Sequence, residues 1–275
     1  MSRVQRAAGG NGSQTSSQDP TKLGNEAPSP MCLLRLKQEL ANMKAKPMQG
    51  VSISPDDNDA STIHALMIGP PDTPYEGGFF NFVFKCTRDY PTKPPRVHLS
   101  TPGAEGVQLN AHINDAGLVC LKMLGTYRGD SWNCSYTVST VLLAIQGVLN
   151  KDCGIENAKR EHAVARHRAY VEHETIRVVV CDAVEDCLKD DSKYPTSFKH
   201  VVLEKFLEFY SKYEDLVKNR LPANGCEMKS YLGAIMGTYE YQRLLARLQE
   251  LRKQVEESIQ VVTATVTNDL VEAAV

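Results

Sequence analysis

Cys120 is the residue whose type and position most directly suggest chemistry. It lies in the apolar segment Leu-Val-Cys-Leu-Lys-Met-Leu over residues 118–124. A deprotonated thiol is a strong nucleophile, and a cysteine can carry a covalent intermediate. A free cysteine in such a segment is also commonly a buried core residue. Its surroundings must decide between a nucleophile and a structural side chain.

His112 and Lys122 are the polar residues near Cys120 that could assist it. His112 lies eight residues before the cysteine, so a thiol hydrolase that uses both is one hypothesis, although two residue types at this separation are a weak signal. Lys122 would either favour the thiolate or lie exposed to solvent.

Other chemistries find little support in the sequence. The eight cysteines are scattered without a CxxC pair, and the three histidines at positions 162, 167 and 173 lack the i, i+4 spacing of helical ligands, so we expect no metal site. The sequence has no GxxxxGK[ST] phosphate loop. Without a secretory signal, most of the cysteines are expected to be reduced thiols.

The composition is that of an ordinary globular protein with one or two domains. Of 275 residues, 42% are hydrophobic and 23% are charged, and 31 Lys and Arg face 33 Asp and Glu. This balance provides no global basic field, so we expect neither nucleic acid nor a membrane as a partner. No stretch reaches about 20 apolar residues, and the expected location is the cytoplasm, with the nucleus as a further location.

The elements around Cys120 predict an α+β layout. Ser29 and Pro30 are an N-cap and a first-turn proline, and the apolar residues that follow at helical spacing are Leu33, Leu36, Leu40 and Met43. Four short β-branched or aromatic runs then predict strands over residues 51–53, 63–68, 79–84 and 97–99. A loop rich in Pro and Gly, residues 69–78, separates the second from the third. A further helix begins at Val138.

Both ends of the chain differ from this central part. Residues 1–28 are polar and rich in Gly and Ser, which predicts a disordered N-terminal tail. Residues 154–256 carry long apolar stripes at helical spacing and predict a helical C-terminal extension. Residues 257–275 mix Val, Thr, Ala and Glu without periodicity, which predicts a flexible tail.

Several motifs occur together in one order. They are Pro-Tyr-Glu-Gly-Gly-Phe at residues 74–79, Tyr-Pro-Thr-Lys-Pro-Pro-Arg-Val at 90–97, Gly-Leu-Val-Cys-Leu at 117–121, and Trp132. Residues 31 to about 153 therefore resemble the catalytic domain of the ubiquitin-conjugating enzymes, the E2 class. The continuation His-Glu-Thr-Ile-Arg-Val at 173–178 and the helices after it resemble an extended member of the same family, to about residue 255.

This resemblance implies a fold and an activity. The fold would be a four-stranded antiparallel meander flanked by helices, the catalytic domain of residues 29–153, followed by the helical extension. Cys120 would accept ubiquitin or a ubiquitin-like protein as a thioester from an activating enzyme (E1) and pass it to a substrate lysine. No cofactor is required, because the activating enzyme uses the ATP. The partners would be the modifier, the E1 and, for some reactions, a ligase (E3). The chain would act as a monomer.

The oxyanion site departs from the family pattern. The family has His-Pro-Asn with Asn eight residues before the cysteine, and this chain has Asn110-Ala111-His112. His112 could donate in place of the amide, Asn110 or Asn114 could reach the site after a loop shift, or the transfer step could be weakened by roughly a hundred- to a thousandfold. The third reading gives the alternative function, a catalytically weakened interaction module of the ubiquitin pathway.

The docking positions also depart from the family. Arg35 and Lys37 lie on the outer face of the first helix, which is either a solvated face or a docking surface for the activating enzyme. Where the family has an apolar ligase anchor, this chain has Thr92 and the polar pair Asn133 and Cys134.

An acidic residue near the incoming lysine is the last position that the resemblance implies. Glu156 is the preferred candidate for this acidic gate, and Asp152 is its competitor. Either side chain could equally be a solvated loop residue.

Overall fold

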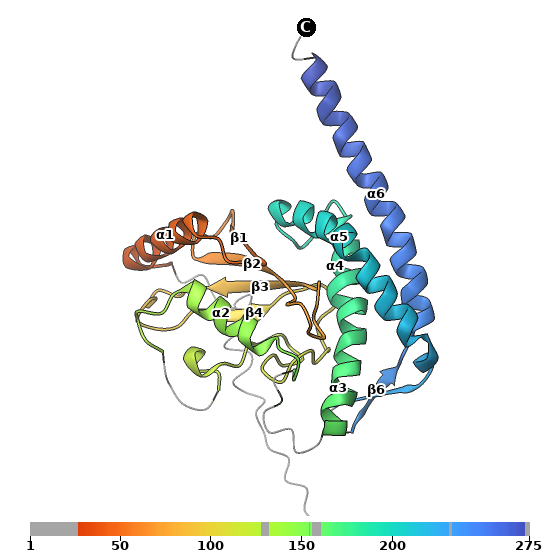
Figure 1. The fold of residues 1–275 in the computed structure, drawn as a ribbon. Helices are drawn as coiled ribbons and strands as arrows, with labels where there is room; N and C mark the ends of the chain where they lie inside the picture. Colours follow the sequence, from red (N-terminus) through yellow and green to blue (C-terminus); the bar gives the residue numbers. More distant parts are fainter. Residues whose placement is uncertain (1–26, 128–131, 154, 156–160, 231–232, 273–275) are drawn as a thin grey trace, which may run out of the picture.

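A four-stranded antiparallel sheet forms the centre of the structure (Figure 1). The computed structural model describes residues 27–127, 132–153, 155, 161–230 and 233–272. The strands β1 (Val51–Pro55), β2 (Thr62–Ile68), β3 (Phe79–Lys85) and β4 (Arg96–Leu99) follow in sequence order, each paired with the next. The predicted meander and the α+β class are confirmed.

Two helices cover one face of this sheet. Helix α1 (Pro30–Ala45) begins at Ser29, whose hydroxyl accepts from the amide of Cys32 at 3.2 Å, and α2 (Val138–Val148) begins at a Thr137 cap. The face that α1 buries differs slightly from the predicted one, because Leu33 is exposed and Glu39 is buried. The acidic side chain has partners there, as described below.

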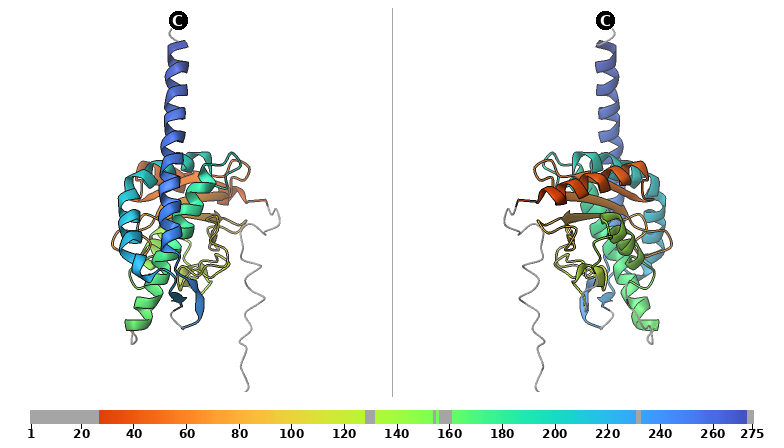
Figure 2. Two further views of the ribbon diagram at one scale, coloured as in Figure 1. Left: turned by 90° about the vertical axis from the view of Figure 1, so that its right-hand side faces the viewer. Right: turned by 90° about the vertical axis from the view of Figure 1, so that its left-hand side faces the viewer.

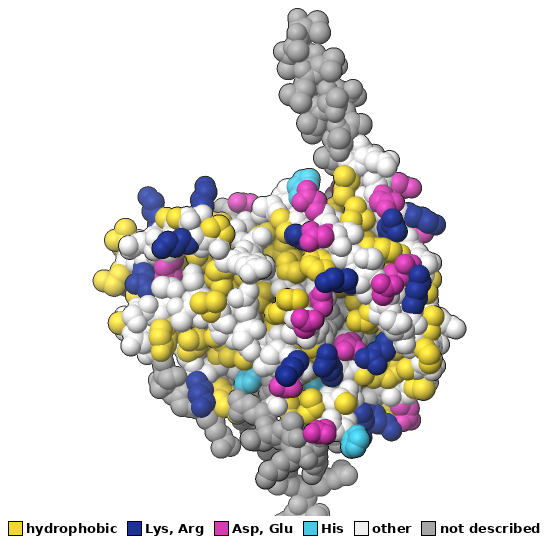
Figure 3. Space-filling view, in the orientation of Figure 1, with side chains coloured by type: hydrophobic (Ala, Val, Ile, Leu, Met, Phe, Trp, Pro, Cys, Tyr) yellow, Lys and Arg dark blue, Asp and Glu magenta, His cyan; other side chains and the backbone are white. Residues whose placement is uncertain are grey.

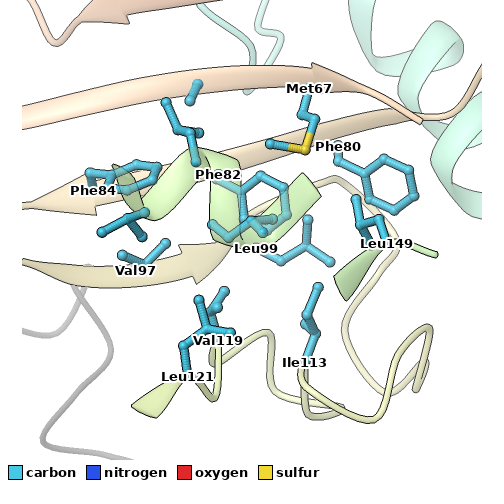
Figure 4. Packing of buried hydrophobic residues seen from close by; sticks show 14 of the residues in the cluster. Met67, Phe80, Phe82, Phe84, Val97, Leu99, Ile113, Val119, Leu121 and Leu149 are labelled. Carbon is cyan, nitrogen blue, oxygen red and sulfur yellow. The ribbon is translucent and has the colours of Figure 1, made fainter. Parts of the chain in front are cut away.

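The main core lies between the sheet and the segment that carries Cys120. Figure 4 shows Phe82, Val97 and Leu99 of the sheet above Val119 and Leu121 of that segment. These side chains are all buried. Alternate residues of β2 and β3 point to the opposite face, as expected for a pleated sheet. On that face Leu66 and Phe79 belong to a second core.

The second core is formed by the C-terminal extension. Its elements are α3 (Glu161–Glu174), a π-helical segment η3 (Thr175–Asp182), α4 (Ala183–Cys187), α5 (Thr196–Arg220), the short helix η4 (Leu221–Ala223) and α6 (Tyr241–Glu272). Because Leu66 and Phe79 pack among its apolar side chains, this extension and the sheet share a core. The predicted helical extension is therefore confirmed as a fold feature, while a small hairpin of β5 (Glu227–Lys229) and β6 (Ile235–Thr238) is additional.

Residues 257–272, which the sequence predicts as part of a flexible tail, are helical in the structure. Helix α6 continues to Glu272 and projects beyond the rest of the protein, as both views of Figure 2 show. The sequence contains no Gly or Pro between Thr238 and the last residue, so no helix-breaking residue interrupts α6. Most of the predicted N-terminal tail, residues 1–26, lies outside the described residues. None of the helices in the described ranges is long and apolar enough to cross a membrane.

Glu39 links the two helices that cover the sheet. Its side chain is 4% exposed and accepts hydrogen bonds from Arg35 Nε at 2.5 Å, from the Tyr90 hydroxyl at 2.7 Å and from the Val138 amide at 2.9 Å. The last bond places a carboxylate at the N-terminus of α2, where the helix dipole favours negative charge. A buried carboxylate is tolerated here because each bond is charge-assisted.

We expect Glu39→Gln to lower the free energy of unfolding by about 2 kcal/mol, because the amide leaves Arg35 without its counter-charge and breaks part of the network. Urea denaturation is the measurement. Gln38→Ala, at an exposed position of the same helix, is the control and should change stability by less than about 0.5 kcal/mol. Equal stability of both variants would contradict this role of Glu39.

Candidate active site

Cys120 lies between two buried neighbours and is itself partly exposed. Val119 and Leu121 belong to the main core, so the thiol between them points away from it. The amide of Cys120 donates to the carbonyl of His112 at 2.7 Å, and its Sγ lies 3.8 Å from the carbonyl oxygen of Leu118. The thiol is therefore held on a fixed backbone and remains accessible.

Thr126 fixes the chain on both sides of the cysteine. Its hydroxyl accepts from the amide of Leu121 at 3.0 Å and donates to the carbonyl of Val119 at 2.7 Å. The short helix η2 (Lys122–Leu124) lies between Leu121 and Thr126. Burial raises the pKa of the Cys120 thiol, and Lys122 is exposed and does not offset this effect. At neutral pH the thiol is thus mostly protonated.

His112 contacts the backbone of the cysteine. Its Nδ1 lies 3.2 Å from the carbonyl oxygen of Cys120, and its ring centroid lies 6.0 Å from that of the half-exposed Tyr127. A carbonyl oxygen only accepts, so Nδ1 is the donor in this bond. Nε2 then carries a hydrogen only when the ring is an imidazolium.

Asn110 is buried and its amide is fully engaged. Its Nδ2 donates to the Tyr75 hydroxyl and to the carbonyl of Val148, both at 2.8 Å, and its Oδ1 accepts from the amide of His112 at 2.8 Å. The Oδ1 of Asn114 accepts from the amide of Leu118 at 2.7 Å, which holds this side chain against its own loop. Asn110 thus supports the backbone of His112, and the His112 ring lies against the carbonyl of Cys120.

Arg35 and Lys37, the two candidate docking residues of α1, differ in their contacts. Arg35 is bound to Glu39 and donates to the carbonyl of Tyr136 at 3.1 Å, so it links α1 to the segment before α2, whereas Lys37 is exposed. Figure 3 shows Lys, Arg and hydrophobic side chains over the α1 surface. Sequence reasoning assigned Arg35 to a partner and missed its buried acceptor.

The loop positions of the ligase surface are exposed and polar. Thr92, Asn133 and Cys134 are all accessible. Trp132 holds their two loops together, because its Nε1 donates to the carbonyl of Pro91 at 2.8 Å. Of the two acidic candidates, Asp152 is exposed in a turn and Glu156 lies outside the described residues.

Tyr75 is a contributor that sequence reasoning did not single out. Its ring is buried in the main core, and its hydroxyl donates to the carbonyl of Leu109 at 2.9 Å while it accepts from Asn110. The sequence signal for it was its place in the motif Pro-Tyr-Glu-Gly-Gly-Phe at residues 74–79. All eight cysteines are free thiols, and within the described residues no three His, Cys, Asp or Glu side chains are grouped to bind a metal ion.

Comparison with known proteins assigns the chain to a family. The ubiquitin-conjugating enzyme family model matches residues 35–178. The chain belongs to this family and is an E2 ubiquitin-conjugating enzyme.

Among its relatives are the ubiquitin-conjugating enzymes E2 Z. The chain is 37% identical to that of Xenopus tropicalis over 247 residues, which cover 87% of this chain and 78% of that protein. It is 38% identical to that of Homo sapiens over 259 residues, 91% of this chain and 72% of that protein. The structure of human ubiquitin-conjugating enzyme E2 G1 matches with a TM-score of 0.39 at 31% identity, over 45% of this chain and 98% of that one.

The raised pKa of Cys120 predicts its reactivity. Alkylation by iodoacetamide requires the thiolate, so its rate at Cys120 in the folded protein should rise at higher pH than at the same cysteine in the urea-unfolded chain. Mass spectrometry of the Cys120 peptide over a pH series measures both profiles. A folded-state profile at or below the unfolded one would show that a neighbouring positive charge outweighs burial.

Proposed function

We propose that the chain carries ubiquitin or a ubiquitin-like protein as a thioester on Cys120 and transfers it to the amine of a substrate lysine. The observation that supports this most directly is the accessible thiol on a backbone fixed by His112 and Thr126. A buried structural cysteine would instead be expected to lie in the core, as Cys32 and Cys86 do.

The proposed reaction has two acyl transfers. In the first, the Cys120 thiolate attacks the carbonyl carbon of the modifier's thioester on the activating enzyme, a new S–C bond forms, and the thiolate of that enzyme leaves. In the second, a deprotonated lysine amine attacks the same carbon, the C–S bond breaks, and the amine proton passes to water. Cys120 returns to its starting state, and no metal or organic cofactor takes part.

The test is a charging reaction with activating enzyme, ATP and ubiquitin, separated on a non-reducing gel. We expect an adduct that thiols remove, and Cys120→Ser should either convert it into a thiol-resistant ester or abolish it. Cys226→Ser is the matched control, because Cys226 is exposed but lies in the extension, and it should charge as the wild type does. Normal charging of Cys120→Ser to a thiol-sensitive adduct would overturn the proposal. Charging without subsequent discharge to lysine would favour the weakened interaction module.

His112 is the residue we assign to the oxyanion. The tetrahedral intermediate places a negative charge on the former carbonyl oxygen, and a preplaced donor stabilises it. Asn110 and Asn114 are bound to other protein groups, whereas the His112 ring lies against the backbone of Cys120. With Nδ1 bonded to the Cys120 carbonyl, Nε2 supplies its hydrogen to the oxyanion in the imidazolium form.

This assignment predicts that loss of the donor slows discharge. His112→Ala should discharge more slowly than the wild type by roughly a hundredfold, because the oxyanion loses its hydrogen-bond donor. His112→Asn keeps an N–H donor at this position and should discharge faster than His112→Ala. Single-turnover discharge of the purified thioester to free lysine measures these rates, and a His112→Ala rate equal to that of the wild type would exclude the role.

The α1 surface is the docking site we propose for the activating enzyme. Lys37 is exposed there, Leu34, which is 70% exposed, lies about one helical turn before it, and Met31, which is 67% exposed, lies about one turn before Leu34. Apolar side chains beside a cation suit a partner with an apolar pocket and an acidic rim. Thr92 and Asn133 offer a ligase no comparable apolar anchor, so an E3 would bind this face through polar contacts.

A further inference from the structure

The C-terminal extension holds the loop of residues 69–78, whose Tyr75 hydroxyl is hydrogen-bonded to Asn110. The Tyr213 hydroxyl of α5 donates to the carbonyl of Gly77 at 2.7 Å, and Lys212 forms an ion pair with Glu76. Tyr213 is 2% exposed and stacks on Phe206, so its ring has little freedom. The extension thus contacts this loop through a fixed, buried hydroxyl.

Gly77 is suited to this contact for two reasons. Its φ of +73° is in the left-handed region, which favours glycine. A Cβ at this position would lie 2.7 Å from the Tyr213 hydroxyl oxygen, closer than real Cβ atoms approach. The backbone of Gly77 therefore contacts the Tyr213 ring of α5 directly, without an intervening side chain.

The loop is rigid between Gly77 and Tyr75. The amide of Gly77 donates to the carbonyl of Gly69 at 3.1 Å, and the amide of Gly78 donates to the carbonyl of Tyr75 at 2.9 Å. A Cβ on Gly69 would lie 1.6 Å from that same carbonyl oxygen, which shows how closely the loop closes on itself. A displacement of Gly77 must accordingly move the backbone of Tyr75.

From Tyr75 the contacts continue to the active site. The Tyr75 hydroxyl accepts from Asn110 Nδ2, and Asn110 Oδ1 accepts from the amide of His112. The carbonyl of His112 accepts from the amide of Cys120, and His112 Nδ1 is hydrogen-bonded to the carbonyl of Cys120. Each of these bonds involves a buried or partly buried group, and the two tyrosine rings are fixed by packing. The path joins helix α5 to the nucleophile through hydrogen bonds of 2.7 to 3.2 Å.

We propose that Tyr213 is a positioning residue for acyl transfer at Cys120, acting through the loop of residues 69–78, Tyr75 and Asn110. The extension then takes part in positioning the site, because its Tyr213 hydroxyl holds the loop whose Tyr75 binds Asn110, the side chain that accepts from the His112 amide. This inference rests on the proposed function of Cys120 and His112. It adds a structural requirement in α5, a segment remote from Cys120 in the sequence.

The test compares Tyr213→Phe, Tyr75→Phe and the double variant, each charged with ubiquitin and discharged to free lysine. Loss of one buried hydrogen bond should lower the maximal discharge rate of Tyr213→Phe by roughly three- to tenfold, with the half-saturating lysine concentration unchanged. Because both hydroxyls act on one path, the double variant should be no slower than the slower single variant. Rates are expressed per molecule of thioester, so partial unfolding does not affect them.

Tyr210→Phe is the matched control. Its ring is also buried in α5, but its hydroxyl bonds Glu214 at 3.4 Å instead of the loop. It should discharge at the wild-type rate. A purely stabilising role of Tyr213 would lower the melting temperature of Tyr213→Phe and leave its discharge rate equal to that of the control, which would overturn the inference, as would additive losses in the double variant.

A second measurement does not depend on transfer. The amide NMR signals of His112 and Cys120 should shift in Tyr213→Phe and stay in place in Tyr210→Phe, because both amides belong to the path. Unmoved signals would also overturn the inference. Failure of the wild type to form a thioester on Cys120 would instead overturn the proposed function itself, whereas normal wild-type transfer with an unaffected Tyr213→Phe would overturn only the role of Tyr213.

Discussion

The burial of Val119 and Leu121 on either side of Cys120 is the constraint on which the active site depends. Two apolar side chains separated by one residue anchor an extended segment to the core, so the intervening thiol must face the other way. The thiol is therefore accessible without any special strain. This geometry also has a chemical cost, because partial burial next to the core raises the pKa of Cys120 and reduces the thiolate. The transfer that we propose therefore relies more on groups that act on the carbonyl than on activation of the sulfur.

The hydrogen bonds of Asn110 explain why its side chain can be buried. An amide with two donors and one acceptor can connect the Tyr75 hydroxyl, the end of α2 and the His112 backbone, and a buried polar group of this kind is stable only when it is satisfied. An amide so bound has no remaining freedom to reach an oxyanion. This is why we propose His112, whose backbone amide Asn110 binds, as the oxyanion donor. Sequence order alone placed Asn110 and His112 both near Cys120, and only the hydrogen bonds of Asn110 distinguish the two.

Sequence periodicity predicted the sheet and most of the helices, but not the end of α6, the β5–β6 hairpin or the side-chain contacts that join the elements. Four short β-branched or aromatic runs predict the meander, because each run is bounded by Pro, Gly or Asp. Arg35 was assigned to a partner surface, since its position on a basic helix face gives no sign of the buried Glu39 beside it. Likewise, no local pattern shows that Tyr213 reaches Gly77, because that contact joins residues 136 positions apart. Cys120 was identifiable only through the motifs around it, and its accessibility only through the packing of its neighbours.

The two acyl transfers that we propose make different demands on this site. Acceptance of the modifier needs the Cys120 thiolate, whereas discharge, after the sulfur has been acylated and no longer needs to ionise, needs a hydrogen-bond donor for the oxyanion. In our proposal that donor is His112. Because its Nδ1 is hydrogen-bonded to the Cys120 carbonyl, Nε2 is the ring nitrogen left for the substrate, so the backbone of the nucleophile itself orients the proposed donor.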